Sequence, residues 1–130
     1  MSVRSRWLCF GLAIAVIWFC VREARNEIAI RRAFPVVRVL GGRIGSLPLW
    51  PIGCEYAISF HGREFTDDEL QRLAVLNELP DRNYISITFS DTNLTAEHIP
   101  KLQKLLPRCS IRRYVKDEFQ DDQKHSDGEE

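Results

Sequence analysis

The pattern of hydrophobic and polar residues separates an apolar stretch near the start of the chain from everything that follows. Residues 7–21 read WLCFGLAIAVIWFCV and contain no charged side chain. As a helix this stretch spans about 22 Å, short of the roughly 30 Å of a bilayer's hydrocarbon core. Arg6 and Arg22 flank it, and arginine side chains can reach outward to the headgroups. Length alone therefore fits either a membrane anchor or the core of a secretory signal.

The flanking residues favour an uncleaved anchor. A signal-peptide cleavage site needs small residues after the apolar run, but here Trp18-Phe19-Cys20-Val21 is followed by charged residues. Trp7 and Trp18 stand near the two ends, where indole rings prefer the membrane interface. We expect a basic N-terminus over 1–6 and a single-pass transmembrane anchor over 7–22, with a cleaved signal and a buried core helix as alternatives. Basic residues flank both ends, so the membrane side of the remaining chain stays open.

The next segment has the composition of a charged helix, which we place at residues 23–42. Pro35 either bends or ends this helix, and Gly41-Gly42 is a strong stop because glycine accepts the left-handed conformation found after helix C-termini. Residues 43–55 carry Gly and Pro at four positions and predict a loop with one short strand at most.

Two later segments match each other when they are shifted by 29 residues: AISFHGREFTDDELQRLAVL, from Ala57, and SITFSDTNLTAEHIPKLQKL, from Ser86. Each begins with the apolar–polar alternation of a half-buried strand. Each then continues with apolar residues at helical spacing. The pattern predicts strands near 56–60 and 85–89, each followed by a helix. A fixed period of this length is typical of solenoid repeats.

Both predicted helices have a threonine where a helix cap is needed. Thr66 with Glu69 forms the T-x-x-E pattern of a capping box. Thr95 stands at the corresponding place in the second copy, where His98 replaces the glutamate and Pro100 disfavours a regular first turn. We therefore expect the second helix to start late.

The second copy resembles the last unit of a degenerate bacterial leucine-rich repeat. ITFSDTNLTAEHIPKLQKLLPRCSI follows the pattern L-x-L-x-x-T-x-I-T-x-x-x-I-x-x-L and closes with L-P-x-C-x-I. The first copy departs from it, because Arg63 stands where Thr92 stands and the link from Leu79 to Tyr84 is long. The layout of the whole chain is similar to that of short membrane-anchored bacterial proteins of this type. The resemblance implies an α/β fold: a transmembrane helix, then a small leucine-rich-repeat-like domain over 56–115 with short parallel strands, the last near 109–115.

Charge is unevenly placed in a chain whose formal net charge is +0. Residues 1–43 hold eight Arg against Glu23 and Glu27. A basic segment beside an apolar helix favours contact with anionic headgroups. We expect Arg6, Arg22 and Arg25 to make this contact, and membrane lipid rather than nucleic acid to be the anionic partner. Residues 116–130 hold seven acids against two Lys and too little apolar surface to fold, so we expect them to be disordered.

The cysteines and the polar clusters give little evidence of chemistry. Cys54 and Cys109 either form a disulfide in an oxidising compartment or are free thiols, and two cysteines do not make a closed zinc site. The three histidines lack metal-ligand spacing, and Asp67-Asp68-Glu69 fits the first turn of a helix, where acids are favoured. We therefore expect no catalytic residue, no metal and no cofactor, and a protein that is not an enzyme.

In a repeat sheet, the outward-facing strand residues are the natural docking positions. Here these are Ser59, His61, Ser86, Thr88 and Ser90. They include none of the Trp, Tyr or Arg side chains that dominate binding energy, so a merely solvated face is the alternative. We predict a membrane-anchored protein-interaction or scaffold module. Two other functions stay open: an enzyme using Cys54, His61 or the acids near Asp67, and a lipid or nucleic-acid binder acting through the arginines of 22–43.

Overall fold

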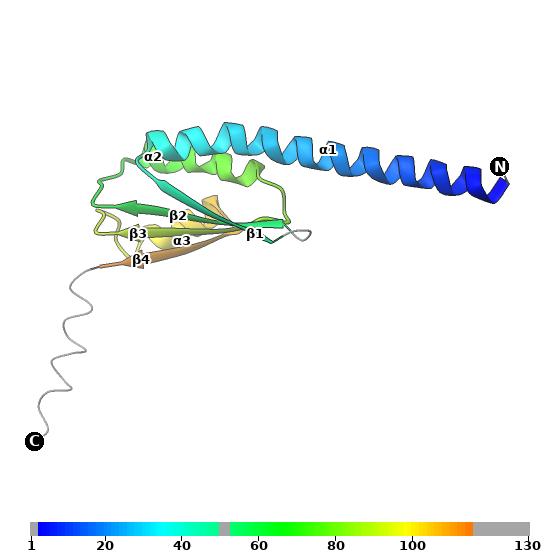
Figure 1. Cartoon of the computed structure of the whole chain (residues 1–130). Coiled ribbons are helices and arrows are strands. Elements are labelled where there is room, and N and C mark those ends of the chain that lie inside the picture. Colours follow the sequence, from blue (N-terminus) through cyan, green and yellow to red (C-terminus); the bar gives the residue numbers. More distant parts are fainter. Residues whose placement is uncertain (1–2, 50–52, 116–130) are drawn as a thin grey trace, which may run out of the picture.

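The computed structural model describes residues 3–49 and 53–115, with side chains from Trp7 onward. A long N-terminal helix leads into a small mixed sheet that is covered by helices (Figure 1). The elements follow the order α1 (Val3–Val39), β1 (Arg43–Leu49), β2 (Gly53–His61), α2 (Asp67–Arg72), η1 (Leu73–Glu78, a 3₁₀ helix), β3 (Tyr84–Ser90), α3 (His98–Leu105) and β4 (Cys109–Tyr114). The predicted α/β fold class is confirmed at this level. The predicted disordered tail, residues 116–130, lies outside the described residues.

The four strands lie in the order β1-β2-β3-β4, with β1 antiparallel to β2 and the other neighbours parallel. Ile58 pairs with Ile87 and Phe60 with Phe89, so the register between β2 and β3 follows the 29-residue shift found in the sequence. The parallel strands predicted near 56–60, 85–89 and 109–115 are confirmed, with each of their ends within a few residues of the expected one.

The first hairpin of the sheet corrects the sequence interpretation. The loop predicted over 43–55 is wrong for most of that range, because β1 pairs with β2 along its whole length and β2 itself begins at Gly53. Pro48 is tolerated because β1 is an edge strand, where a residue without an N–H donor can be placed. Gly53 is required by close packing, since a Cβ at this position would collide with the carbonyl oxygen of Arg82.

The long helix α1 runs without interruption from the apolar run into the domain. Pro35 lies inside the helix and does not end it, so the predicted anchor (7–22) and charged helix (23–42) form one element. The predicted Gly-Gly stop is confirmed. Gly41 has a φ of 76° and its N–H donates to the Arg38 carbonyl, while the Gly42 N–H donates to the Val37 carbonyl. This is the hydrogen-bond pattern of a Schellman cap.

The core lies between one face of the sheet and a layer made of the C-terminal half of α1, α2 with η1, and α3 (Figure 1). Alternate residues of the strands point into it, and Ile58, Phe60, Ile87 and Phe89 are almost fully buried. The phenyl rings of Phe60 and Phe89 stack with their centroids 5.3 Å apart. From α1 and the residue that follows it, the core receives side chains at helical spacing, namely Ala29, Ala33, Val37 and Leu40.

The start of α2 follows the predicted capping chemistry, whereas the predicted Thr95 cap of α3 is wrong, because Glu97 precedes this helix and no side chain caps it. The Glu69 N–H donates to the Thr66 hydroxyl at 3.3 Å and the Thr66 N–H donates to the Glu69 carboxylate at 3.0 Å, which completes the capping box. Before α3, the Thr95 N–H donates to Nδ1 of His98 at 3.1 Å, so histidine takes the place of the glutamate. α3 itself begins only at His98, and the predicted late start is confirmed.

Candidate functional site

The sheet face opposite the helices is open, and its outward-facing residues include four rows of at least three residues that cross the strands. The pairing registers define these rows. Starting at the end nearest the projecting half of α1, they are Leu47, Glu55 and Tyr84; Gly45, Ala57, Ser86 and Ser110; Arg43, Ser59, Thr88 and Arg112; and His61, Ser90 and Tyr114. We call this surface the open face. A row of small residues crosses it between rows that carry larger side chains.

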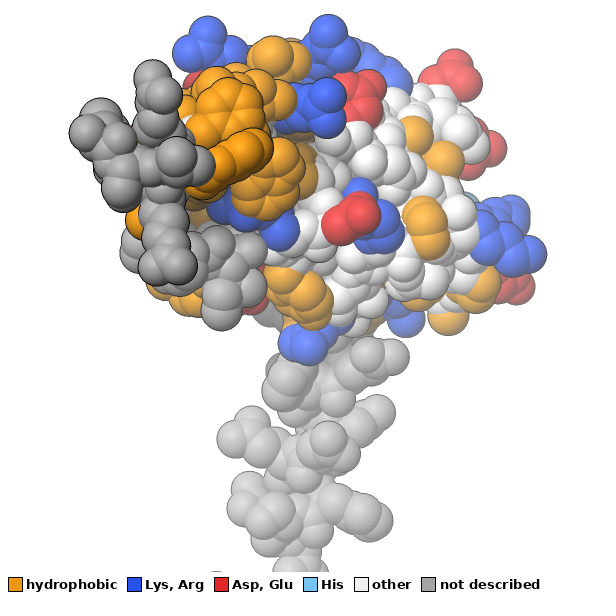
Figure 2. Space-filling view, turned by 90° about the vertical axis from the view of Figure 1, so that its right-hand side faces the viewer, with side chains coloured by type: hydrophobic (Ala, Val, Ile, Leu, Met, Phe, Trp, Pro, Cys, Tyr) orange, Lys and Arg blue, Asp and Glu red, His pale blue; other side chains and the backbone are white. Residues whose placement is uncertain are grey.

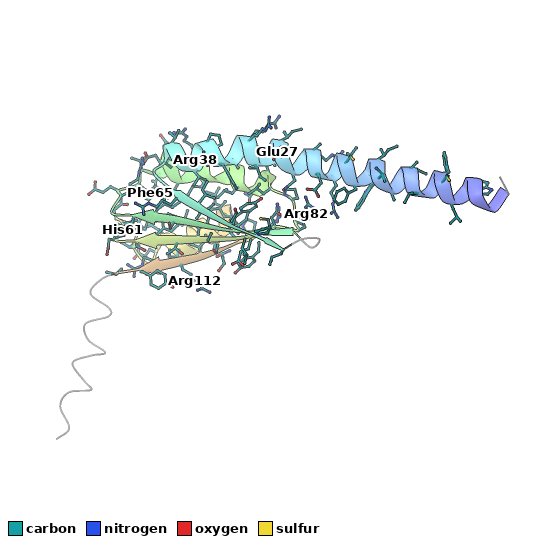
Figure 3. All side chains as sticks on the ribbon, viewed as in Figure 1. Glu27, Arg38, His61, Phe65, Arg82 and Arg112 are labelled. Carbon is teal, nitrogen blue, oxygen red and sulfur yellow. The ribbon has the colours of Figure 1, made fainter. Side chains whose placement is uncertain are left out.

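All five residues that the sequence singled out for partner binding lie on the open face. Ser59 and His61 are exposed, and Ser86, Thr88 and Ser90 are half-buried. The His61 ring lies at the end of the sheet far from the projecting helix (Figure 3), with its Nδ1 3.7 Å from a carboxylate oxygen of Asp91. The geometry thus brings the five residues onto one surface.

The same surface also contains larger side chains that the sequence interpretation missed. Leu47, Tyr84 and Tyr114 are 56%, 49% and 43% exposed, and Arg112 lies on the side of the sheet away from α1 (Figure 3). The expectation that the face lacks Tyr and Arg is therefore wrong. The signal was present in the alternation of β4, where Arg112 and Tyr114 share the phase of Ser110, but only the register with β3 assigns that phase to the open face.

A polar junction ties α1 to the end of the domain from which its apolar half projects. The guanidinium of Arg82 donates to both carboxylate oxygens of Glu23, at 2.7 and 3.0 Å. This contact holds the pKa of Glu23 below its usual value and raises the pKa of Arg82. Bidentate pairs of this kind fix orientation as well as adding energy. Figure 3 shows Arg82 at this end of the sheet, beneath the point where α1 leaves the domain.

The buried Asn83 extends the junction into the sheet. Its Nδ2 donates to Oδ1 of Asn26 at 2.8 Å, and its Oδ1 accepts from the Cys54 N–H at 3.2 Å. The side chain of Asn83, the residue directly before β3, therefore links Asn26 of α1 to Cys54 at the start of β2. Beside it, burial raises the pKa of the Tyr56 hydroxyl to about 12, so Tyr56 stays neutral.

The three arginines that were expected to contact headgroups do not all fall within the described side chains. Arg6 is part of α1, but its side chain lies outside the described residues. Arg22 and Arg25 lie where α1 leaves the domain and, with Trp18, Val21 and Pro80, line a hollow of about 420 Å³. The Arg22 guanidinium carbon lies 5.1 Å from the ring centroids of both Trp18 and Phe19.

Comparison with protein-family models, curated proteins and solved structures found no match for this chain. The geometry of the described residues is therefore the basis of the functional argument that follows.

The candidate residues for an enzyme site are Cys54, His61 and the acids near Asp67. Cys54 and His61 stand near opposite ends of β2, about 23 Å apart at the rise of an extended strand. Asp67 lies on α2, in the helical layer on the other side of the sheet. These residues do not meet at one substrate. A separate hollow of about 240 Å³ between α2 and α3 includes Asp67, His98 and Lys101, and His98 is already engaged there with Thr95.

Cys54 and Cys109 are both free thiols in this structure. Cys54 lies on β2 and the buried Cys109 on β4, with β3 between them. Two strand spacings amount to about 9.6 Å, beyond the Cα separation that a disulfide can bridge. Of the two alternatives drawn from the sequence, the geometry favours free thiols. Burial raises the pKa of Cys109 to about 11, which keeps this thiol protonated and unreactive.

The N-terminal half of α1 is the one segment of the described chain that is long and apolar enough to cross a membrane. None of this segment is buried in the domain, and Trp7, Leu12 and Ile17 are 71%, 69% and 63% exposed. Viewed from the end where α1 projects, hydrophobic side chains gather on the helix and Lys and Arg side chains lie around it (Figure 2). Residues 7–21 are therefore not a helix buried in the core of the domain.

Proposed function

We propose that this chain is a single-pass membrane protein whose small domain binds another protein through the open face. The observation that carries the proposal is the unbroken passage of α1 from an exposed apolar half to a half that is packed into the core. Exposed apolar side chains over more than four helical turns are unfavourable in water and favourable in lipid. The anchor and the domain therefore act as one rigid piece.

The geometry of the anchor determines where a partner must stand. The axes of the strands lie roughly along the axis of α1 (Figure 1). When the helix stands upright in the membrane, the open face therefore points sideways along the membrane surface. β2 has nine residues, so the face extends about 30 Å from the bilayer. A partner that covers it stands beside the domain at the membrane. We infer that the partner is another membrane protein, bound through its juxtamembrane region.

The side chains of the open face suggest what this partner offers. The row of Gly45, Ala57, Ser86 and Ser110 forms a flat strip of small residues across the sheet. Exposed tyrosines on either side of this row supply the aromatic contacts that are enriched at binding hot spots. Arg43 and Arg112 outnumber Glu55, the one acid in the rows. A segment with small or apolar residues and at least one carboxylate fits this surface in shape and charge.

We also propose that the parallel part of the sheet is a degenerate leucine-rich-repeat-like stack. The 29-residue sequence shift and the β2–β3 register coincide, and each copy continues from a strand into a helix that covers the same core. Two copies are fewer than the three or so that such stacks usually need. β1 and the C-terminal half of α1 cover the end next to β2 and supply the missing burial.

Site-directed photo-crosslinking in native membranes tests the proposed docking surface. A photoreactive residue at Ser86 should crosslink to an integral membrane protein, whereas one at the exposed Gln71 on α2 should not. Replacing Thr88 by Arg places bulk and charge in the centre of the face, and we expect it to reduce the Ser86 crosslink at least about tenfold, which corresponds to roughly 1.4 kcal/mol. Gln71→Arg, with the same new side chain on the helical layer, should leave the crosslink unchanged.

Equal crosslinking from Ser86 and Gln71, or an unchanged product in Thr88→Arg, would remove the open face as a docking surface. Products formed only with soluble proteins would contradict the inference that the partner is a membrane protein.

A further inference from the structure

We propose that the hollow between α1 and the loop before β3 binds the phosphate-containing headgroup of an anionic phospholipid. This inference rests on the proposed anchoring and adds to it a specific binding site at the membrane surface. The hollow is lined by Trp18, Val21, Arg22, Arg25 and Pro80.

The position of the hollow matches the level of the headgroups. Val21 is the last residue of the uncharged run and is 47% exposed, while Glu23 is already bound to Arg82 of the domain. The change from lipid-facing helix to domain-packed helix therefore takes place within a single turn. Trp18 marks the same level, because indole rings prefer the membrane interface.

Helical spacing directs the lining residues to one side. Trp18, Arg22 and Arg25 are separated by four and three residues, so they share a face of α1. The same face continues through Asn26 and Ala29 toward the domain. The arginines thus line a half-open hollow between α1 and Pro80, whose volume of about 420 Å³ is far more than the roughly 30 Å³ of one water molecule.

The nearby carboxylates are already used by other arginines. Glu23 receives both bonds from Arg82, and Arg22 reaches it only at 3.5 Å. Glu27 pairs with Arg31, and Glu78 with Arg32. Among the residues that the structure describes, no carboxylate pairs with Arg25, and the buried Nε of Arg22 has no hydrogen-bond partner.

The hollow therefore has an excess of positive charge from Arg22 and Arg25, which favours a phosphate. The Arg22 guanidinium, which lies over the Trp18 and Phe19 rings, is held in place for this contact. Arg25 adds a second positive charge one turn further from the hydrocarbon. A headgroup with net negative charge suits this pair better than a zwitterionic one, whose own cation offsets its phosphate. Each basic residue near an anionic surface contributes about 1 kcal/mol, or about a fivefold preference.

The test uses the full chain in nanodiscs made of equal parts phosphatidylglycerol and phosphatidylcholine. Native mass spectrometry measures which lipid stays bound when the protein is released. We expect wild type to retain phosphatidylglycerol over phosphatidylcholine, Arg25→Gln to lose about fivefold of that preference and Arg22→Gln/Arg25→Gln to lose more. Arg25 is exposed, so its single replacement leaves the fold intact.

The matched control is Arg38→Gln/Arg43→Gln, which removes the same charge at the far end of the domain and should retain the preference. An equal loss in this control would show diffuse attraction without a site and would overturn the proposal. Equal retention of both lipids by wild type would also overturn it, while leaving the anchor intact. Displacement of the lipid by inorganic phosphate would assign the hollow to a soluble anion. A chain that does not enter nanodiscs would overturn the anchor and the headgroup site together.

Discussion

At the scale of single residues, the most constrained positions lie where two segments of backbone approach closely. Gly42 and Gly53 are both of this kind, because a Cβ on either would meet neighbouring atoms well inside contact distance. At Gly42 these atoms are the side chains of Val37 and Phe60, whereas at Gly53 the main obstacle is backbone. The sequence indicates only that glycine is present. Which glycines are required depends on long-range packing that no local pattern contains.

Gly53→Ala should destabilise the domain by about 1–3 kcal/mol, because the β2 backbone must move away from the carbonyl of Arg82 to admit the methyl group. Gly45→Ala is the control. It stands in β1 of the same sheet, where a Cβ has a single neighbour at 3.8 Å. Replacing a strand glycine by alanine at such a position should stabilise by roughly 0.5–1 kcal/mol. Chemical denaturation of the two variants measures both effects, and equal destabilisation would contradict the packing at Gly53.

At the scale of elements, the sequence predicts helices and strands best where a local pattern is compatible with a single type of structure. The alternation at Ile58 and Ile87 and the Gly-Gly stop of α1 are both found as expected. β1 was missed because Gly45 and Pro48 are typical of loops, although an edge strand tolerates both. Pro35 was expected to bend or end α1, and of these alternatives the ending is wrong, because the helix continues through it. An internal proline costs roughly 3 kcal/mol, and burial of Ala33 and Val37 against the core offsets this.

In the candidate sites, too, the residues placed by strand periodicity were predicted, and those placed by long-range pairing were missed. The alternation placed Ser59, Ser86 and Thr88 on one face, since a strand has a period of two. It did not place Tyr84, Arg112 and Tyr114 beside them, because that requires the β3–β4 register. The pairing of Glu23 with Arg82, which are distant in sequence, leaves no local signal at all.

The junction between α1 and the domain should weaken in acid. The Arg82 guanidinium lowers the pKa of Glu23 in the folded protein, so this pair contributes stability above the ordinary glutamate pKa of about 4.5 and loses it as the pH falls through the lowered value. We expect the protection factors of the amides around Asn26 in α1, which correct for the intrinsic pH dependence of exchange, to fall below about pH 4.5 more steeply in wild type than in Glu23→Gln.

Glu27→Gln is the control for the junction, because the partner of Glu27, Arg31, is also on α1, so this ion pair does not link the helix to the sheet. This variant should keep the pH dependence of wild type. A wild-type profile as flat as that of Glu23→Gln would show that the pair does not hold the helix to the domain.

At the scale of the whole molecule, we propose that one helix serves as both membrane anchor and structural component of the domain. Its C-terminal half supplies Ala29, Ala33 and Val37 to the core, so the domain cannot swing on a linker. The open face and the headgroup hollow are then held at a fixed height and direction relative to the bilayer. Both proposed binding sites depend on this rigidity.

The most direct test of the account is a scan of single spin labels along α1 of the full chain in liposomes, with accessibility to oxygen and to a water-soluble relaxation agent measured at each position. Labels over 10–17 should lie in lipid, and labels at the exposed Ala24, Arg31 and Arg38 should face water. Between these two regions the helical period should continue without a break. Water accessibility over 10–17, or loss of the helical period between Val21 and Ala29, would contradict the account.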